Sequence, residues 1–281
     1  MPDVVVIANL EKPRTPRILH EVEERLRGEG LSYRVLGLEG SLPEASLDGA
    51  RLAISIGGDG TVLYSARLVA SHGVPLLPIN AGRLGFLAEL GEGEWSEVFS
   101  SWKEGEALVS ERLMLKATVS RGGEVVASCI GLNDAVISSS GISKIVRLSV
   151  VMHSCTMGEY HADGVIIATP TGSTAYSAAA GGPILHPEVP AFIVTPICAL
   201  SLASRPVVTP SSEPVIARVH HHLRTGVLLT IDGQEVVELA PGDEVRVEDA
   251  GIRARLLLSP RWTFYDVLRT KLGWSGGPVY A

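Results

Sequence analysis

The spacing of apolar residues changes near residue 104, and this change limits the folds that the chain can adopt. Before that point, short β-branched runs such as residues 4–8 and 52–56 alternate with stretches of helical periodicity. Strands that alternate with helices predict a parallel sheet of the Rossmann type, whose buried strands are continuously apolar. After it, short apolar runs follow one another with turns between them, which predicts an all-β, sandwich-like domain.

We therefore predict an α/β nucleotide-binding domain with a parallel sheet over residues 1–104 and a β-rich domain over residues 105–261. One short helix is expected near residues 174–180 of the second domain. Its expected strands, all short and bounded by turn residues, are 113–120, 124–132, 145–152, 165–169, 215–219, 227–231, 244–247 and 252–258. We expect the aromatic residues after position 261 to lie in the core, namely Trp262, Phe264, Tyr265 and Trp274.

Composition excludes several classes of partner. The 281 residues are 46% hydrophobic and 20% charged, which is typical of a globular enzyme and not of a disordered chain. The net charge of −7 offers no overall attraction for nucleic acid or an anionic membrane, so an anionic substrate would need a local site. No apolar run approaches the roughly 18 residues of a membrane helix, and no basic leader opens the chain. We expect a cytoplasmic protein that binds neither nucleic acid nor membrane.

The first motif with chemical content is Gly57-Gly58-Asp59-Gly60, between an expected strand and a helix expected from Thr61. Glycines let a ligand approach the backbone, and amides at a helix start bind anions. A carboxylate inside such a cradle repels phosphate, but it is useful if it accepts a proton from an attacking hydroxyl or helps to hold Mg²⁺. The alternative is a tight turn with Asp59 as helix N-cap. A Walker A loop is excluded because no Gly-Lys-Ser/Thr follows.

The second motif is the run Thr169-Pro170-Thr171-Gly172-Ser173-Thr174, which follows an expected strand and precedes a helix. Hydroxyls and free amides at a helix start suit ribose and phosphate oxygens, and Tyr176 offers a face on which a base could stack. The alternative is an ordinary capping turn rich in serine and threonine.

With these motifs, the sequence resembles an NAD kinase over nearly its whole length. The Gly-Gly-Asp-Gly element alone is shared with diacylglycerol and sphingosine kinases and with phosphofructokinases, whereas the full set in this order is specific. The segments that carry the resemblance are residues 57–60, 80–87, 133–134, 163–177, 181–187 and 232–234.

The resemblance implies transfer of a phosphoryl group from ATP, or from polyphosphate, to the 2′-hydroxyl of the adenosine ribose of NAD, which gives NADP. It also implies Mg²⁺ or another divalent metal as cofactor, a homodimer or homotetramer, and a tail, residues 262–281, that packs on the first domain. Asp59 would be the general base, with Gly58 and Gly60 beside it.

Further substrate-binding roles are implied in the same way. Asn133 and Asp134 would bind the adenine-side ribose or base, although many relatives carry Glu in place of Asp134, and Asp163 would meet the nicotinamide end. Lys144 and His161 would approach the substrate phosphates. The other implied substrate-binding residues are Asn80, Phe86, Thr171, Thr174, Ala175, Tyr176, Ser177, Ala179 and Gln234.

Two rival functions remain open from the sequence. A lipid kinase with the same glycine motif would need a basic or apolar docking patch, and this acidic chain shows none. A module that binds NAD without chemistry is the other rival, although a carboxylate in its phosphate cradle would be a liability. The run His220-His221-His222 is expected to be an exposed strand end, because consecutive strand residues alternate faces and cannot converge on one metal ion.

Overall fold

The computed structural model describes residues 2–38, 47, 49–82, 85–91, 93–141, 145–201, 203–220 and 226–274. The chain divides into two compact units, Met1–Glu111 with Ala254–Ala281, and Arg112–Arg253. The predicted limits at residues 104 and 261 fall outside the long strands β5 (Val109–Arg121) and β16 (Glu244–Leu257), whereas this division falls within them.

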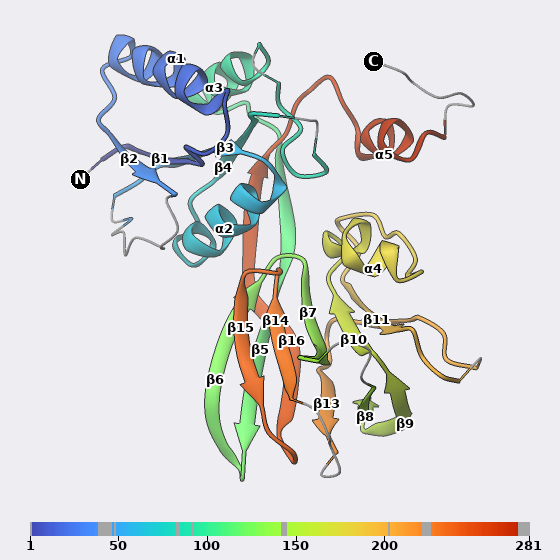
Figure 1. Cartoon of the computed structure of the whole chain (residues 1–281). Coiled ribbons are helices and arrows are strands. Elements are labelled where there is room, and N and C mark those ends of the chain that lie inside the picture. Colours follow the sequence, from blue (N-terminus) through green and yellow to red (C-terminus); the bar gives the residue numbers. More distant parts are fainter. Residues whose placement is uncertain are drawn as a thin grey trace. The chain divides into compact units, whose positions relative to one another are not determined.

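The first unit is built on a parallel sheet in the order β2-β1-β3-β4, which the last residues of β16 join through Leu256 beside Leu76. Figure 1 shows helices α1 and α3 over one face of this sheet and α2 on the opposite face. The elements of the unit are β1 (Val4–Ala8), α1 (Thr15–Gly28), β2 (Tyr33–Gly37), β3 (Leu52–Gly57), α2 (Asp59–Val69), the 3₁₀ turn η1 (Ala70–His72), β4 (Leu76–Asn80), α3 (Trp95–Glu104) and α5 (Phe264–Leu272).

The second unit contains two packed sheets. The antiparallel six-stranded sheet has the order β12-β11-β10-β7-β14-β15, and the facing strands are β16-β13-β8-β9 with β5 and β6. Alternate residues of both sheets, such as Ile137, Leu229 and Val215, fill the core between them. The remaining elements are β6 (Glu124–Gly131), β7 (Asp134–Ser139), β8 (Val146–Met152), β9 (Cys155–Ala162), β10 (Gly164–Ala168), η2 (Gly172–Thr174), α4 (Tyr176–Ala179), β11 (Ala191–Ile197), β12 (Val207–Pro210), β13 (Val215–Val219), β14 (Val227–Ile231) and β15 (Glu235–Leu239).

The predicted fold class, a parallel α/β domain followed by an all-β sandwich, is confirmed. The prediction of two separate strands at residues 244–247 and 252–258 was wrong, because β16 is continuous. Gly251 takes a φ of 70° and its amide donates to the carboxylate of Asp249 at 2.9 Å, so the glycine marks an irregularity within the strand and not its end.

The expectation that the tail aromatics lie in the core is also wrong. The exposed fractions of Trp262, Tyr265 and Trp274 are 44%, 63% and 64%, and α5 buries Val267 and Leu268 instead. An aromatic side chain can cover surface without being enclosed, so aromatic content alone does not predict burial.

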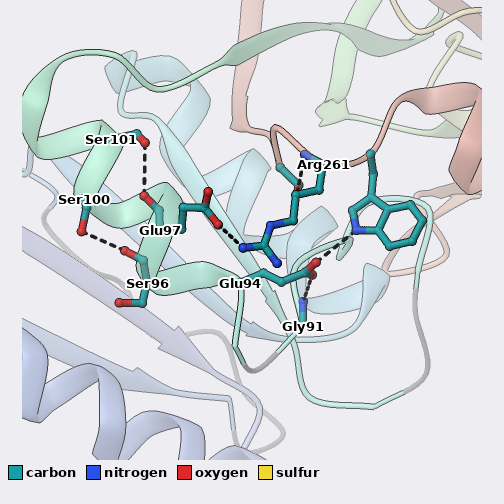
Figure 2. Close-up of polar contacts among 9 residues, drawn as sticks. Gly91, Glu94, Ser96, Glu97, Ser100, Ser101 and Arg261 are labelled. Carbon is teal, nitrogen blue, oxygen red and sulfur yellow. Dashed lines mark hydrogen bonds and ion pairs between the residues drawn. The ribbon is translucent and has the colours of Figure 1, made fainter.

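The segment after β16 is joined to the start of α3 by polar contacts. As Figure 2 shows, Glu94 accepts a bond from the amide of Gly91 and Arg261 reaches Glu97 at 2.6 Å. The indole N–H of Trp262 donates to the other oxygen of Glu94 at 3.1 Å. No helix within the described ranges is long and apolar enough to span a membrane.

Candidate functional site

Asp59 lies at the carboxyl end of β3, as the first residue of α2, and its carboxylate is held by backbone amides. Oδ2 accepts a bond from the amide of Phe86 at 2.9 Å, and Oδ1 accepts from Leu87 and Ala88 at 3.1 and 3.0 Å. The sequence predicted a phosphate cradle made by the amides of the glycine turn, with Asp59 inside it, and did not predict which amides bond the carboxylate. The amides that do so belong to the loop after β4.

That loop is itself braced by Asn80, the last residue of β4. The buried side chain of Asn80 donates to the carbonyl of Ala88 at 2.9 Å and accepts from the amide of Gly82 at 2.6 Å. Asn80 therefore shapes the loop whose amides hold Asp59.

Glycine at position 85 is required by space. A carbon placed at the Cβ position of Gly85 would lie 1.8 Å from Oδ1 of Asp59, which is far inside contact distance. The absence of a side chain at this position lets the loop close over the carboxylate.

A separate cavity of about 390 Å³ lies in the second unit, on the outer face of the six-stranded sheet. The strand alternation explains its position: odd residues of β7, such as Ile137, enter the core, and even ones face outward. The residues that line the cavity come from β7, β14, their neighbouring turns and the start of α4, and are Asn133, Asp134, Val136, Ser138, Ala175, Tyr176, Thr230, Asp232 and Gly233.

Asp232 fixes the polar end of this cavity; the sequence placed it in the motif of residues 232–234 but gave it no role. Its carboxylate accepts bonds from the amides of Leu132, Asn133 and Asp134 at 2.9, 2.7 and 3.1 Å. Asp232 and Gly233 take φ values of 52° and 66° in the turn between β14 and β15, as the predicted Asp-Gly hairpin requires.

The ionisation of Asp134 is unusual. Two causes raise the pKa of the Asp134 carboxyl to about 7: burial, which is the larger, and the nearby negative charge of Asp232. Near neutral pH this side chain can therefore either donate or accept a hydrogen bond in the cavity.

The segment from Thr169 to Gly172 is packed tightly on Asn133. The Thr169 amide donates to the Asn133 carbonyl at 2.8 Å, and a Cβ at Gly172 would lie 2.1 Å from the same oxygen. In the described part of the chain, Asn133 Oδ1 and Thr171 Oγ1 are buried and have no hydrogen-bond partner. Buried polar atoms without a partner are costly, so these two favour a bound polar ligand.

Four of the predicted substrate-binding residues line the cavity: Asn133, Asp134, Ala175 and Tyr176. Tyr176 is 47% exposed, so its ring is accessible.

Other predicted residues close to the cavity make structural contacts. Ser177 is fully buried, and its hydroxyl lies 3.0 Å from that of Thr195 on β11. The hydroxyl of Thr174 donates to the carbonyl of Thr171 at 3.2 Å. The backbone amide of Gln234 donates to the carbonyl of Ile231 at 2.9 Å.

The remaining predicted residues lie elsewhere. Asp163 is exposed just before β10, and His161 is half-buried on β9 at 3.7 Å from Glu159. Ala179 is exposed at the end of α4. Gly58 and Gly60 flank Asp59.

Some predictions fall on parts of the chain that the structure does not describe. Lys144 lies outside the described residues, and so do His221 and His222 of the histidine run. His220 follows the last residue of β13 and is half-buried.

Phe86, one of the implied substrate-binding residues, is half-buried in the first unit, in the loop that holds Asp59. The ammonium of Lys271 on α5 lies 5.8 Å from the centre of its ring. The ring therefore has a cation close to one of its faces.

Comparison with known protein families gives matches over most of the chain. Residues 12–107 match the family described as the ATP-NAD kinase N-terminal domain, and residues 132–258 match the ATP-NAD kinase C-terminal domain. The chain is 40% identical over 279 residues to the NAD kinase of Treponema denticola, with 98% of each chain covered. It is 38% identical over 282 residues to that of Geobacter sulfurreducens, with 98% of this chain and 99% of the relative covered.

Two solved structures share the fold. Yeast NADH kinase complexed with NADH superposes with a TM-score of 0.85 at 24% identity, covering 100% of this chain and 90% of the yeast chain. An NAD kinase from Archaeoglobus fulgidus in complex with ATP gives a TM-score of 0.75 at 21% identity, covering 97% of this chain and 98% of the archaeal one.

Proposed function

The chain belongs to the NAD kinase family, and from this premise we propose that it transfers the terminal phosphoryl group of ATP to the 2′-hydroxyl of the adenosine ribose of NAD. Membership confirms the resemblance found in the sequence motifs and the prediction of a phosphotransferase. It disfavours the lipid kinase alternative. Inorganic polyphosphate, which shares the phosphoanhydride bond, is the alternative donor.

The observation that carries the proposal is the fixed carboxylate of Asp59. Three backbone amides donate hydrogen bonds to this carboxylate, and Oδ2 accepts only one of them. Oδ2 therefore keeps a lone pair that can accept a hydroxyl proton. In the proposed step, the 2′-hydroxyl proton moves to Oδ2 while the ribose oxygen bonds to the γ-phosphorus. The bond from that phosphorus to the bridging oxygen breaks, and ADP leaves with the electron pair.

The cavity in the second unit supports recognition of an adenine nucleoside. The unpartnered Oδ1 of Asn133, which lines the cavity, is an acceptor suited to the exocyclic amine of adenine. Tyr176 offers an accessible ring for stacking at the rim of the cavity. These features favour binding of the base in the second unit.

A resident metal site is not apparent in the residues that the structure describes. No group of three or more His, Cys, Asp or Glu side chains in those residues could hold an ion. Because Mg²⁺ in phosphoryl-transfer sites is commonly held by substrate phosphates with few protein ligands, we infer that it would enter with the donor and neutralise charge on the phosphate oxygens.

The decisive assay is NADP formation from NAD, ATP and Mg²⁺. Turnover by the variant Asp59→Asn should fall about 10²–10⁴-fold, because it lacks the base, while it still binds NAD and keeps its melting temperature. Binding of NAD without any NADP from the wild-type protein would support the sensing module. Phosphorylation of diacylglycerol or sphingosine instead of NAD would support a lipid kinase.

A homodimer or homotetramer and a cytoplasmic location remain part of the proposal. Light scattering at micromolar concentration should give a mass of two or four chains. A monomer under these conditions would contradict the proposed assembly.

A further inference from the structure

Lys12 lies in the loop between β1 and α1, beside the glycine turn of Asp59. The amide of Asn9 donates to the carbonyl of Ile56 at 3.0 Å and so extends the pairing of β1 with β3 by one residue. The amide of Lys12 then donates to the Asn9 carbonyl at 3.3 Å, and that of Thr15 to the Lys12 carbonyl at 3.0 Å. These bonds fix the backbone of Lys12 at the carboxyl edge of the sheet, where open α/β sheets bind ligands.

The side chain of Lys12 extends across bare backbone. A Cβ placed on Gly58 would lie 2.9 Å from the ammonium nitrogen of Lys12, and one placed on Gly82 would lie 3.6 Å from it. The ammonium therefore lies between the glycine turn before Asp59 and the loop that holds the Asp59 carboxylate.

This cation has no protein counter-ion within the described ranges. None of the ion pairs there involves Lys12, whereas Lys103 pairs with Glu29. The nearby carboxylate of Asp59 is bonded to the amides of Phe86, Leu87 and Ala88 instead. A half-buried ammonium directed at a glycine turn and left without a carboxylate is a site for an anion.

We propose that Lys12 binds the terminal phosphates of the phosphoryl donor, an inference that rests on the proposed kinase function and adds a residue to it. The chain has no Walker A lysine after its glycine turn, and Lys12 supplies an equivalent point charge from a different loop. Its ammonium donates to oxygens of the donor phosphoanhydride and balances the charge that passes to the leaving phosphate. ATP and polyphosphate share this group, so Lys12 serves either donor.

The test compares Lys12→Ala with the matched surface control Lys103→Ala in the NADP assay. For Lys12→Ala the KM for ATP should rise about tenfold to a hundredfold, because one charge-assisted hydrogen bond is lost. Its KM for NAD and its melting temperature should match those of the wild type, and Lys12→Arg should recover part of the ATP affinity. An unchanged KM for ATP, or equal losses in NAD affinity and thermal stability, would overturn the proposal.

A binding measurement separates this inference from the proposed function. Calorimetry without NAD would compare wild type and Lys12→Ala for Mg²⁺–ATP and, in a second arm, for Mg²⁺–tripolyphosphate. Weaker binding of both by the variant supports Lys12 as a phosphate ligand even if the wild type makes no NADP, in which case only the kinase proposal fails. Weakening confined to ATP, or no binding of either probe by the wild type, contradicts it.

Discussion

Gly85→Ala should disable the enzyme without straining its backbone. The φ of Gly85 is not in the left-handed region, so alanine can adopt the same conformation, and the effect of the change comes from space alone. The new methyl carbon would lie 1.8 Å from Oδ1 of Asp59, whereas real Cβ contacts essentially never fall below 3.0 Å.

The loop or the carboxylate must therefore move by more than about 1 Å, and a displacement of that size costs roughly a hundredfold in rate when it involves a reacting group. The same movement would break the hydrogen bonds of 2.9–3.1 Å from the backbone amides to the Asp59 carboxylate. We expect kcat for NADP formation to fall about a hundredfold.

Gly82→Ala is the matched control in the same loop. Its Cβ would lie 3.6 Å from Nζ of Lys12 and 3.8 Å from Oδ1 of Asn80, which is ordinary contact. Because Lys12 is proposed to bind the donor, the comparison is made at saturating ATP, where kcat of Gly82→Ala should stay within about twofold of the wild type. A wild-type kcat in Gly85→Ala, or an equal loss in Gly82→Ala, would refute the argument from close approach.

Three further predictions concern the second unit. The folded-state pKa of Asp134, about 7, lies above its ordinary value of 3.8, so the contribution of its proton to stability is fully present below about pH 4 and is lost as pH rises from there through 7. The stability of Asp134→Asn relative to wild type should therefore increase between about pH 5 and pH 8 in thermal melts, and a pH-independent difference would contradict the assignment. Asp232→Ala leaves three buried amides without their acceptor and should lower the free energy of unfolding by about 3 kcal/mol or more in urea titrations, whereas a loss below about 1 kcal/mol would show that the turn is not the anchor. Tyr176→Ala should raise the KM for NAD about tenfold with little change in melting temperature, and Tyr176→Phe should restore it, because the ring and not the hydroxyl is proposed to stack.

The periodicity of the sequence was sufficient for the fold class but not for every strand. β1 and β3 were predicted because buried parallel strands are continuously apolar. β9 was missed because the turn that leads into it uses His153 and Ser154 at φ values of 49° and 59°, where glycine or asparagine would have given a recognisable signal. The helix expected at residues 174–180 is divided at Ala175, whose φ and ψ of −101° and −128° are not helical.

Residues of the candidate site were predictable where they lie together in a short sequence motif. Asn133, Asp134 and Tyr176 lie in recognisable segments and line one cavity. Lys12 could not be found in that way, and Asp232 was given no role although it lies in the motif of residues 232–234, because each matters through a contact with a segment far away in the chain. Such contacts depend on how strands are ordered in a sheet, which local spacing does not encode.

The way in which Asp59 is held has a consequence for how this protein can vary. Its three donors are main-chain amides, so substitutions at Phe86, Leu87 or Ala88 change side chains without deleting a donor. Proline is the exception, because it has no amide hydrogen. Substitutions can therefore change the surface of this loop, including the ring of Phe86 beside Lys271, while the three main-chain hydrogen bonds to the Asp59 carboxylate keep their donors.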